Sequence, residues 1–287
     1  MQKRHGAYAL ASIACDVEVN QVKIAEAGGI PPLVQLITNG TYMQKQQATL
    51  ALSFLAHISS NRVKIGEAGG IAPLVQLITS GTDMQKEYAT SALGNIASDV
   101  EVNRVQIAKA GGIPPLVQLI TAGMEMQKAN AARVLFYLAH DFRISDRIAE
   151  EAGIPRLVQL IRSGTDIEKE CAALVLRNLA TLVVDRVKIA EAGGIPPLVE
   201  LIRSGTDMQK VFAAQALGNV GRDVEANHDK IAEAGGILAL EQLMMTGTDM
   251  QKNYALVALE FARKPSSTDS LPGRLPDRLA ITGVKNA

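Results

Sequence analysis

One phrase recurs six times along this 287-residue chain at nearly constant spacing. In its clearest copies it reads Gly-Ile-Pro-Pro-Leu-Val, and successive copies are 41 or 42 residues apart. The six copies begin at Gly29, Gly70, Gly112, Gly153, Gly194 and Gly236. A fixed period of this length is typical of stacked helical repeats, in which each unit packs only on its neighbours. The period therefore predicts one elongated all-α array.

Each unit resolves into three predicted helices. The first is short and ends at a glycine such as Gly111, because glycine accepts the left-handed conformation that terminates a helix. The second begins after Ile113-Pro-Pro, where proline suits a first helical turn. The third opens at Thr82, which with Gln85 three residues later forms a capping box, and it runs to Ala97.

This pattern resembles the armadillo repeat: a short helix, a Gly-Gly corner, a proline-started second helix and a long third helix ending in Gly-Asn-Ile-Ala. The wording Gly-Gly-Ile-Pro-Pro-Leu-Val and Gly-Thr-Asp-Met-Gln-Lys is similar to the regular arrays of vacuolar-protein-eight-like and protist or plant armadillo proteins. More distantly, the chain resembles importin alpha and beta-catenin. The resemblance implies a right-handed α-α superhelix that binds other proteins.

The array is predicted to span residues 1–264. Met1-Gln-Lys matches the Met-Gln-Lys that opens the third helices at Met43, Met84, Met126, Met208 and Met250, so residues 1–15 are interpreted as the third helix of a partial repeat. Full repeats are placed at about 16–57, 58–98, 99–140, 141–181, 182–222 and 223–264, followed by a disordered tail over 265–287. The first helix then lacks a capping repeat. We expect its outer edge to expose apolar surface, open to further repeats, to another chain or to edge-to-edge self-association.

Composition narrows the function classes. Twenty-nine basic and 29 acidic residues balance, without the basic excess typical of a nucleic-acid binder. No apolar run is long enough for a transmembrane helix, and no signal peptide stands at Met1. Two cysteines, Cys15 and Cys171, lie nearly four repeats apart, too far for a disulfide. These features favour an intracellular protein of the cytoplasm or nucleus.

Catalytic and metal-binding patterns are absent from the sequence. The four histidines have no metal-ligand spacing, and His57 and His140 lie two repeats apart. The glycines recur as helix stops, so Gly-Gly-Ile is a corner and not a phosphate loop. We therefore expect no enzyme, no cofactor and no metal site.

Three positions on the third helices form columns along the predicted groove of an armadillo fold. The position of Asn95 holds Ser12, Phe54, Asn95, Tyr137, Asn178, Asn219 and Phe261. Four residues earlier, on the same helix face, stand Tyr8, Leu50, Ser91, Arg133, Leu174, Gln215 and Val257. Three residues earlier again stand His5, Gln47, Tyr88, Asn130, Cys171, Phe212 and Tyr254.

These columns contain seven of the ten aromatic residues, where chance would place fewer than one. Aromatic side chains dominate binding hot spots, and asparagine can both donate to and accept from a peptide backbone. The columns predict a near-neutral recognition groove for extended peptide segments. Phe212 and Tyr254, early in their helices, are the members most open to a core role instead.

Each predicted third helix also carries a lysine in its first turn. These lysines are interpreted as solvated first-turn lysines, although they could also steer an acidic partner.

The leading function is a non-catalytic scaffold or adaptor. The alternative is the substrate-binding array of a larger ubiquitin ligase or kinase. A nuclear-import adaptor is disfavoured, because Ser91, Leu174 and Gln215 stand where importin alpha carries a tryptophan column.

Overall fold

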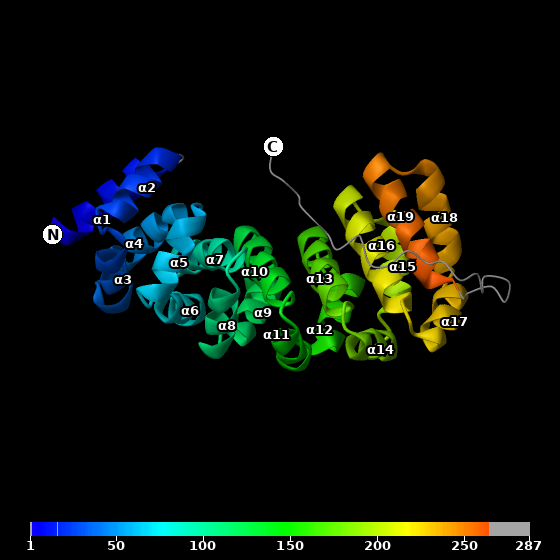
Figure 1. Cartoon of the computed structure of the whole chain (residues 1–287). Helices are drawn as coiled ribbons and strands as arrows, with labels where there is room; N and C mark the ends of the chain where they lie inside the picture. Colours follow the sequence, from blue (N-terminus) through cyan, green and yellow to red (C-terminus); the bar gives the residue numbers. More distant parts are fainter. Residues whose placement is uncertain (1, 16, 264–287) are drawn as a thin grey trace, which may run out of the picture.

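A computed structural model describes residues 2–15 and 17–263, and within these ranges it contains nineteen α-helices and no strand. The predicted tail at 265–287 lies outside the described residues. The helices follow one another as an elongated array from α1 at one end to α19 at the other (Figure 1). The all-α solenoid predicted from the repeat period is therefore confirmed.

The helices recur in groups of three. The third helices are α1 (Gln2–Ala14), α4 (Tyr42–Leu55), α7 (Asp83–Ala97), α10 (Glu125–Leu138), α13 (Asp166–Leu179), α16 (Asp207–Gly221) and α19 (Asp249–Ala262). The first helices are α2 (Glu18–Glu26), α5 (Ser59–Glu67), α8 (Glu101–Lys109), α11 (Phe142–Ile148), α14 (Val183–Glu191) and α17 (Glu225–Glu233). The second helices are α3 (Ile30–Asn39), α6 (Ile71–Ser80), α9 (Ile113–Ala122), α12 (Ile154–Ser163), α15 (Ile195–Ser204) and α18 (Gly236–Thr246).

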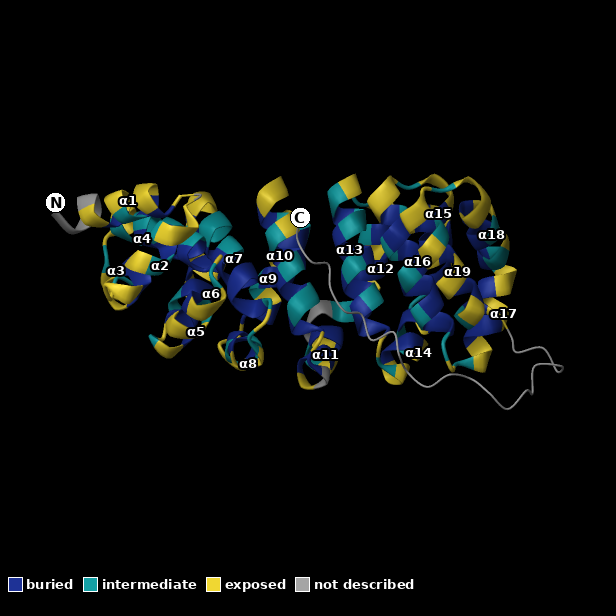
Figure 2. Ribbon diagram, turned by 45° about the horizontal axis from the view of Figure 1, so that its top comes forward, coloured by how far each residue is buried: buried dark blue, intermediate teal, exposed yellow. Residues whose placement is uncertain are grey.

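Each third helix packs against the second helix of its own unit and against the third helices on either side. The first helices α5, α8, α11, α14 and α17 form a row along one edge of the array (Figure 2). Buried alanine, leucine, isoleucine and valine fill the space between the helices, as at Leu52, Leu93 and Leu135. The core is therefore one continuous apolar seam that runs the length of the array.

Glutamine side chains join successive third helices. In α7, the Oε1 of Gln85 accepts from the backbone N–H of Thr82 (3.1 Å), and its Nε2 donates to the carbonyl of Tyr42 in α4 (3.1 Å). Gln127, Gln209 and Gln251 make the same two bonds. In α13 the residue is Glu168, whose carboxylate side chain has no N–H to donate. The Nζ of Lys128 in α10 donates to its Oε1 instead, at 2.8 Å. Each glutamine thus caps its own helix and fixes it to the one before.

The first helices are tied in a similar way by asparagine. The Nδ2 of Asn103 donates to the carbonyl of Arg62 (3.0 Å) in the preceding first helix and to that of Ile96 (3.2 Å) at the end of α7. Asn61 and Asn227 repeat this pair of bonds. The second bond of each pair reaches a carbonyl in the last turn of a third helix, where backbone carbonyls have no i+4 partner within the helix.

The corner between first and second helices depends on glycine. In five corners the first glycine of Gly-Gly is left-handed, with φ of +76° at Gly69. At Ala152-Gly153 the pair is incomplete, and the left-handed residue is Gly153 (φ +70°), one position later. The helix before this corner therefore runs one residue further than in the other units. Its last turn is a π-helix, η1 (Ala149–Gly153), which accommodates that residue. One missing glycine therefore makes this unit irregular.

A Gly69→Ala substitution is expected to lower the free energy of unfolding by about 1 kcal/mol, because a side chain disfavours the left-handed conformation. A Cβ there would meet nothing within 4 Å, so the loss is purely conformational. Urea denaturation of the two proteins measures it. Gly69→Asn is the control: asparagine tolerates this conformation, so it should lose less. Equal losses for the two variants would contradict this explanation.

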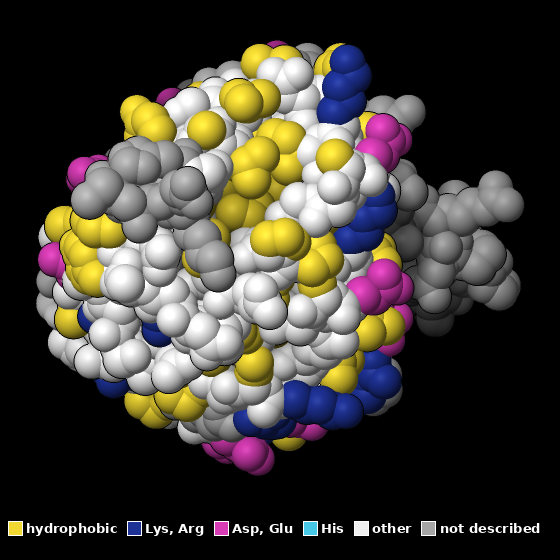
Figure 3. Space-filling view, turned by 90° about the vertical axis from the view of Figure 1, so that its left-hand side faces the viewer, with side chains coloured by type: hydrophobic (Ala, Val, Ile, Leu, Met, Phe, Trp, Pro, Cys, Tyr) yellow, Lys and Arg dark blue, Asp and Glu magenta, His cyan; other side chains and the backbone are white. Residues whose placement is uncertain are grey.

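The two ends of the array differ in polarity. At the N-terminal end Ile13 is 50% exposed, although its counterparts Leu55 and Ile96 are fully buried. Hydrophobic side chains gather around a hollow on that end (Figure 3). At the other end, Glu260 in α19 and its C-cap residue Arg263 stand where α16 has glycines, and Arg263 pairs with Glu241. The apolar N-terminal edge expected from the sequence is thus present.

Candidate binding face on the third helices

The three columns form one face, here called the third-helix face. Most of its members are neither fully buried nor fully solvated. Exposed members are Tyr8, Ser12, Tyr254 and Val257. Half-buried members are Gln47, Leu50, Phe54, Tyr88, Ser91, Asn130, Arg133, Tyr137, Leu174, Phe212, Gln215, Asn219 and Phe261. Asn95, Cys171 and Asn178 are buried, with 8%, 5% and 4% exposure.

None of the seven column aromatics is buried. Phe54, Tyr137 and Phe212 pack against the core with part of their surface and leave the remainder open. Tyr254, one of the two residues considered for a core role, is 36% exposed and does not fill the core. A row of half-exposed aromatic side chains is therefore presented on the third helices.

The sequence analysis expected each asparagine amide to donate to and accept from a bound peptide. In the structure the amide nitrogens are already bonded to the protein. The Nδ2 of Asn95 donates to the carbonyl of Ser53 (3.3 Å), that of Asn178 to Phe136 (2.7 Å) and that of Asn219 to Arg177 (3.0 Å). Each accepting carbonyl belongs to the preceding third helix, one residue before the matching column position. One N–H of each amide thus links neighbouring helices. The Oδ1 of Asn178 also accepts from Arg177, so the Oδ1 atoms of Asn95 and Asn219 are the acceptors that can face a partner.

An arginine between two aromatic rings dominates the middle of the face. The guanidinium of Arg177 in α13 lies 4.8 Å from the ring centroid of Phe136 in α10 and 5.6 Å from that of Phe212 in α16. It donates to the Oδ1 of Asn178 (3.2 Å) and to the Oε1 of Gln215 (2.8 Å). Burial lowers the pKa of Arg177 to about 10, so it stays charged at neutral pH. Three neighbouring third helices therefore meet at one cation.

Neither Arg177 nor Phe136 belongs to the three columns. Both occupy the position immediately before the asparagine column. That position holds Ala11, Ser53, Gly94, Phe136, Arg177, Gly218 and Glu260. Phe136 also makes edge-to-face contacts with Tyr137 (5.2 Å) and His140 (4.9 Å). The sequence signal that could have revealed the cluster of Phe136 and Arg177 is the change at this position from small residues such as Gly94 to a large ring and a charged side chain.

More arginines border the same end of the third helices. The guanidinium of Arg222 lies 3.9 Å above the ring of Phe261, and Arg133 donates a long bond (3.4 Å) to the carbonyl of Ser91. Burial lowers the pKa of Arg133. Loss of hydration and the charges of Arg177 and Arg104 lower the pKa of His140. The face is therefore more positive in its middle than the near-neutral groove expected from the columns.

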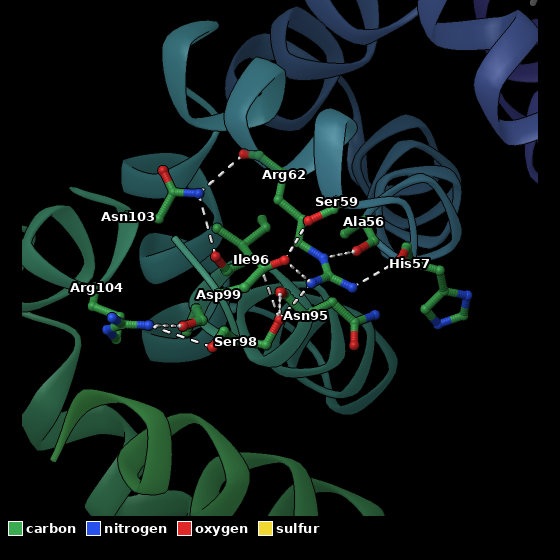
Figure 4. A network of polar contacts seen from close by, with 11 residues as sticks. Ala56, His57, Ser59, Arg62, Asn95, Ile96, Ser98, Asp99, Asn103 and Arg104 are labelled. Carbon is green, nitrogen blue, oxygen red and sulfur yellow. Dashed lines mark hydrogen bonds and ion pairs between the residues drawn. The ribbon is translucent and has the colours of Figure 1, made fainter. Parts of the chain in front are cut away.

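First-helix arginines fix the ends of third helices (Figure 4). Arg62 donates to the carbonyls of Ala56 and His57 and forms an ion pair with Asp99 (2.8 Å) in the next unit. Arg104 similarly donates to the carbonyl of Ala97 (2.9 Å). Cations at these carbonyls complement the negative end of the helix dipole.

Arg104 lacks the carboxylate that Arg62 has. The corresponding residue, Asp141, instead accepts hydrogen bonds from Arg143, which holds the pKa of Asp141 below its usual range. The same unit carries Ser145 where its neighbours carry arginine, and the hydroxyl of Ser145 is buried without a hydrogen-bond partner. The irregular unit therefore alters the charge pattern beside the third-helix face.

The other candidate sites are the cysteines, possible metal clusters and surface depressions. In the described residues no cluster of three or more histidine, cysteine, aspartate or glutamate side chains could hold a metal. Cys15 is exposed and Cys171 is buried, neither is in a disulfide, and burial raises the pKa of Cys171 to about 12. One depression of about 470 Å³ is lined by residues of α12 and α15, among them Arg162 and Glu200, and by none of the column residues. None of the described helices is long and apolar enough to span a bilayer.

Comparison with known proteins identifies the fold family. The Armadillo/beta-catenin-like repeat family matches residues 59–98 and 100–140. A designed armadillo repeat protein solved with a (KR)4 peptide superposes with a TM-score of 0.75 at 26% identity, covering 82% of this chain and 99% of that one. The chain is an armadillo-repeat protein.

Two engineered proteins of known crystal structure are also similar to this armadillo chain. One superposes with a TM-score of 0.83 at 32% identity over 90% of this chain; the chain spans 64% of its length. The other has a TM-score of 0.76 at 30% identity, covering 82% of this chain and 96% of that protein. No curated protein sequence matches this one.

Proposed function

We propose that this armadillo array is a non-catalytic scaffold that binds extended segments of other proteins on its third-helix face. The observation that carries the proposal is the row of column aromatics, none of which is buried. Aromatic side chains held half-exposed by a rigid scaffold offer large contact area at small entropic loss. The peptide bound to the designed armadillo neighbour supports the same class of ligand.

The asparagine arrangement suits this role. Each Nδ2 is occupied by the preceding helix, so the Oδ1 of Asn95 or Asn219 is held in a fixed direction. A fixed acceptor can receive a backbone N–H of an extended peptide without first losing rotamer freedom. The array would then recognise main chain with its amides and side chains with the aromatic rows.

A variant in which Phe54, Tyr88 and Tyr137 are all alanine is expected to bind peptide at least tenfold more weakly, because truncation of aromatic anchors typically removes most of the affinity. Random 12-residue peptides displayed on phage are selected on the purified array. The affinity of the selected peptides is then measured by fluorescence anisotropy for the parent and the variant.

Tyr42→Ala is the matched control, since Tyr42 is 52% exposed at the first residue of α4 and lies outside the columns. Circular dichroism establishes that each variant is folded. Unchanged affinity in a folded triple variant, or failure of the selection to yield any binder, would overturn the proposed function.

A further inference from the structure

From the arginines on the third-helix face we infer that its middle, over α10, α13 and α16, accepts an extended acidic segment, with aspartate or glutamate side chains paired to Arg133, Arg177 and Arg222. This rests on the proposed function and adds the charge of the partner. The total charge of the chain is zero, so the inference depends on where charges lie and not on their sum.

Uncompensated positive charge is the first observation. Among the described residues, carboxylates pair with Arg62, Lys128, Arg143, Arg186, Lys188 and Arg263. No such ion pair in this part of the chain includes Arg104, Arg133, Arg177 or Arg222. These four guanidinium groups instead contact aromatic rings, carbonyls and amides. Their contacts leave the positive charge unneutralised.

Incomplete solvation is the second observation. The Nε–H groups of Arg104, Arg133 and Arg222 are buried without a hydrogen-bond partner. Arg177 uses its Nε, Nη1 and Nη2 in three bonds to neutral side chains, whereas a guanidinium has five N–H donors. Burial has removed part of the hydration of these guanidinium groups without supplying an anion. A carboxylate from a partner would therefore form strong, charge-assisted hydrogen bonds with them.

Two carboxylates that closely follow α10 and α16 are engaged by other arginines: Asp141 accepts hydrogen bonds from Arg143, and Asp223 pairs with Arg186. Two acidic residues of the third helices lie farther from the arginines. Glu87 and Glu170 are eight residues before Asn95 and Asn178, a separation of about 12 Å along an α-helix. Burial raises the pKa of Glu170. Arg177 lies in the last turn of α13, and Arg222 is the C-cap residue of α16. A partner that runs across α10, α13 and α16 here would meet arginines and rings, while Asp141 and Asp223 are held by Arg143 and Arg186.

The test uses three fluorescein-labelled 12-residue peptides of equal length: (Glu-Ser)6, (Gln-Ser)6 and (Lys-Ser)6. We expect the acidic peptide to bind at least tenfold more tightly than the glutamine peptide and the basic peptide to bind most weakly. The preference should be lost in an Arg133→Gln, Arg177→Gln, Arg222→Gln triple variant. Arg203→Gln, on the second helix α15, removes the same charge away from the face and should retain it.

If the triple variant does not fold, Arg222→Gln alone serves, because the Arg222 side chain contacts a ring and forms no ion pair with a described residue. Equal binding of the three peptides, or tighter binding of the basic one, overturns the acidic partner. Peptides selected by display on the same array would still support the proposed function, so the two failures are distinguishable.

Discussion

Replacing Gly218 with valine is expected to destabilise the C-terminal end of the array by about 1–3 kcal/mol, the usual effect of forcing a side chain into a filled interface. A Cβ at this glycine would lie 2.7 Å from the Cα of Ala258 in α19. A Cβ at Gly221, one turn later, would lie equally close to the carbonyl oxygen of Phe261, at 2.7 Å. The backbones of α16 and α19 can therefore pack in this way only without a side chain between them.

Hydrogen exchange of the α19 amides and urea denaturation measure the effect. Gly94→Val is the matched control, since Gly94 occupies the same repeat position in α7. A Cβ there would meet only the side chain of Arg133, with its Nε at 2.8 Å, and a flexible side chain can move. The loss should therefore be clearly larger at Gly218. Equal losses would show that close backbone approach is not what matters.

The contrast between Gly94 and Gly218 illustrates what the sequence could establish. The repeat period, the left-handed glycines and the capping boxes are local or periodic features, and each was predicted because its cause lies within a few residues. What a glycine faces in the next unit depends on residues about 40 positions away. The space beside the glycine is therefore occupied by an arginine side chain at Gly94 and by a helix backbone at Gly218.

The candidate face was predicted less completely than the fold. The columns identified half-exposed aromatics, but they did not show that the asparagine amides are bonded to the preceding helix. They also missed Arg177, because its role comes from rings on two other helices. Competition between neighbouring units for one carboxylate, as between Arg143 and Arg104 for Asp141, decides which arginines keep a free charge. Such competition cannot be read from one repeat alone.

Asp185→Asn is expected to raise the stability of the array by about 1–3 kcal/mol at neutral pH, because it removes a buried carboxylate that lacks hydrogen-bond partners. Asp185 is fully buried in α14, and neither carboxylate oxygen has a hydrogen-bond partner apart from the ion pair to Lys188 at 3.5 Å. Asn61, Asn103 and Asn227 occupy the matching position in other units, where their Nδ2 donates to two carbonyls. An asparagine at 185 would supply the same donor.

The gain should depend on pH in a defined direction. Burial, opposed by Lys188 and reinforced by Asp146, raises the pKa of Asp185 above its ordinary value. The folded state therefore holds this proton at pH values where the unfolded chain, with a pKa near 3.9, has lost it. The penalty is absent below that pH, grows as the pH rises through the folded pKa, and is complete above it. The advantage of Asp185→Asn should accordingly shrink from pH 7 to pH 4.

Urea midpoints of the parent and the variant at pH 7 and pH 4 test this expectation. Asp99→Asn is the control of opposite sign: hydrogen bonds from Arg62 and Ser59 outweigh the effect of burial and lower the pKa of Asp99, so its carboxylate favours the folded state. That variant should be slightly less stable at pH 7 and should approach the parent as the pH falls. If Asp185→Asn were neutral at pH 7, the ion pair with Lys188 would fully offset burial of the carboxylate, and the asparagine ladder would contribute nothing at this position.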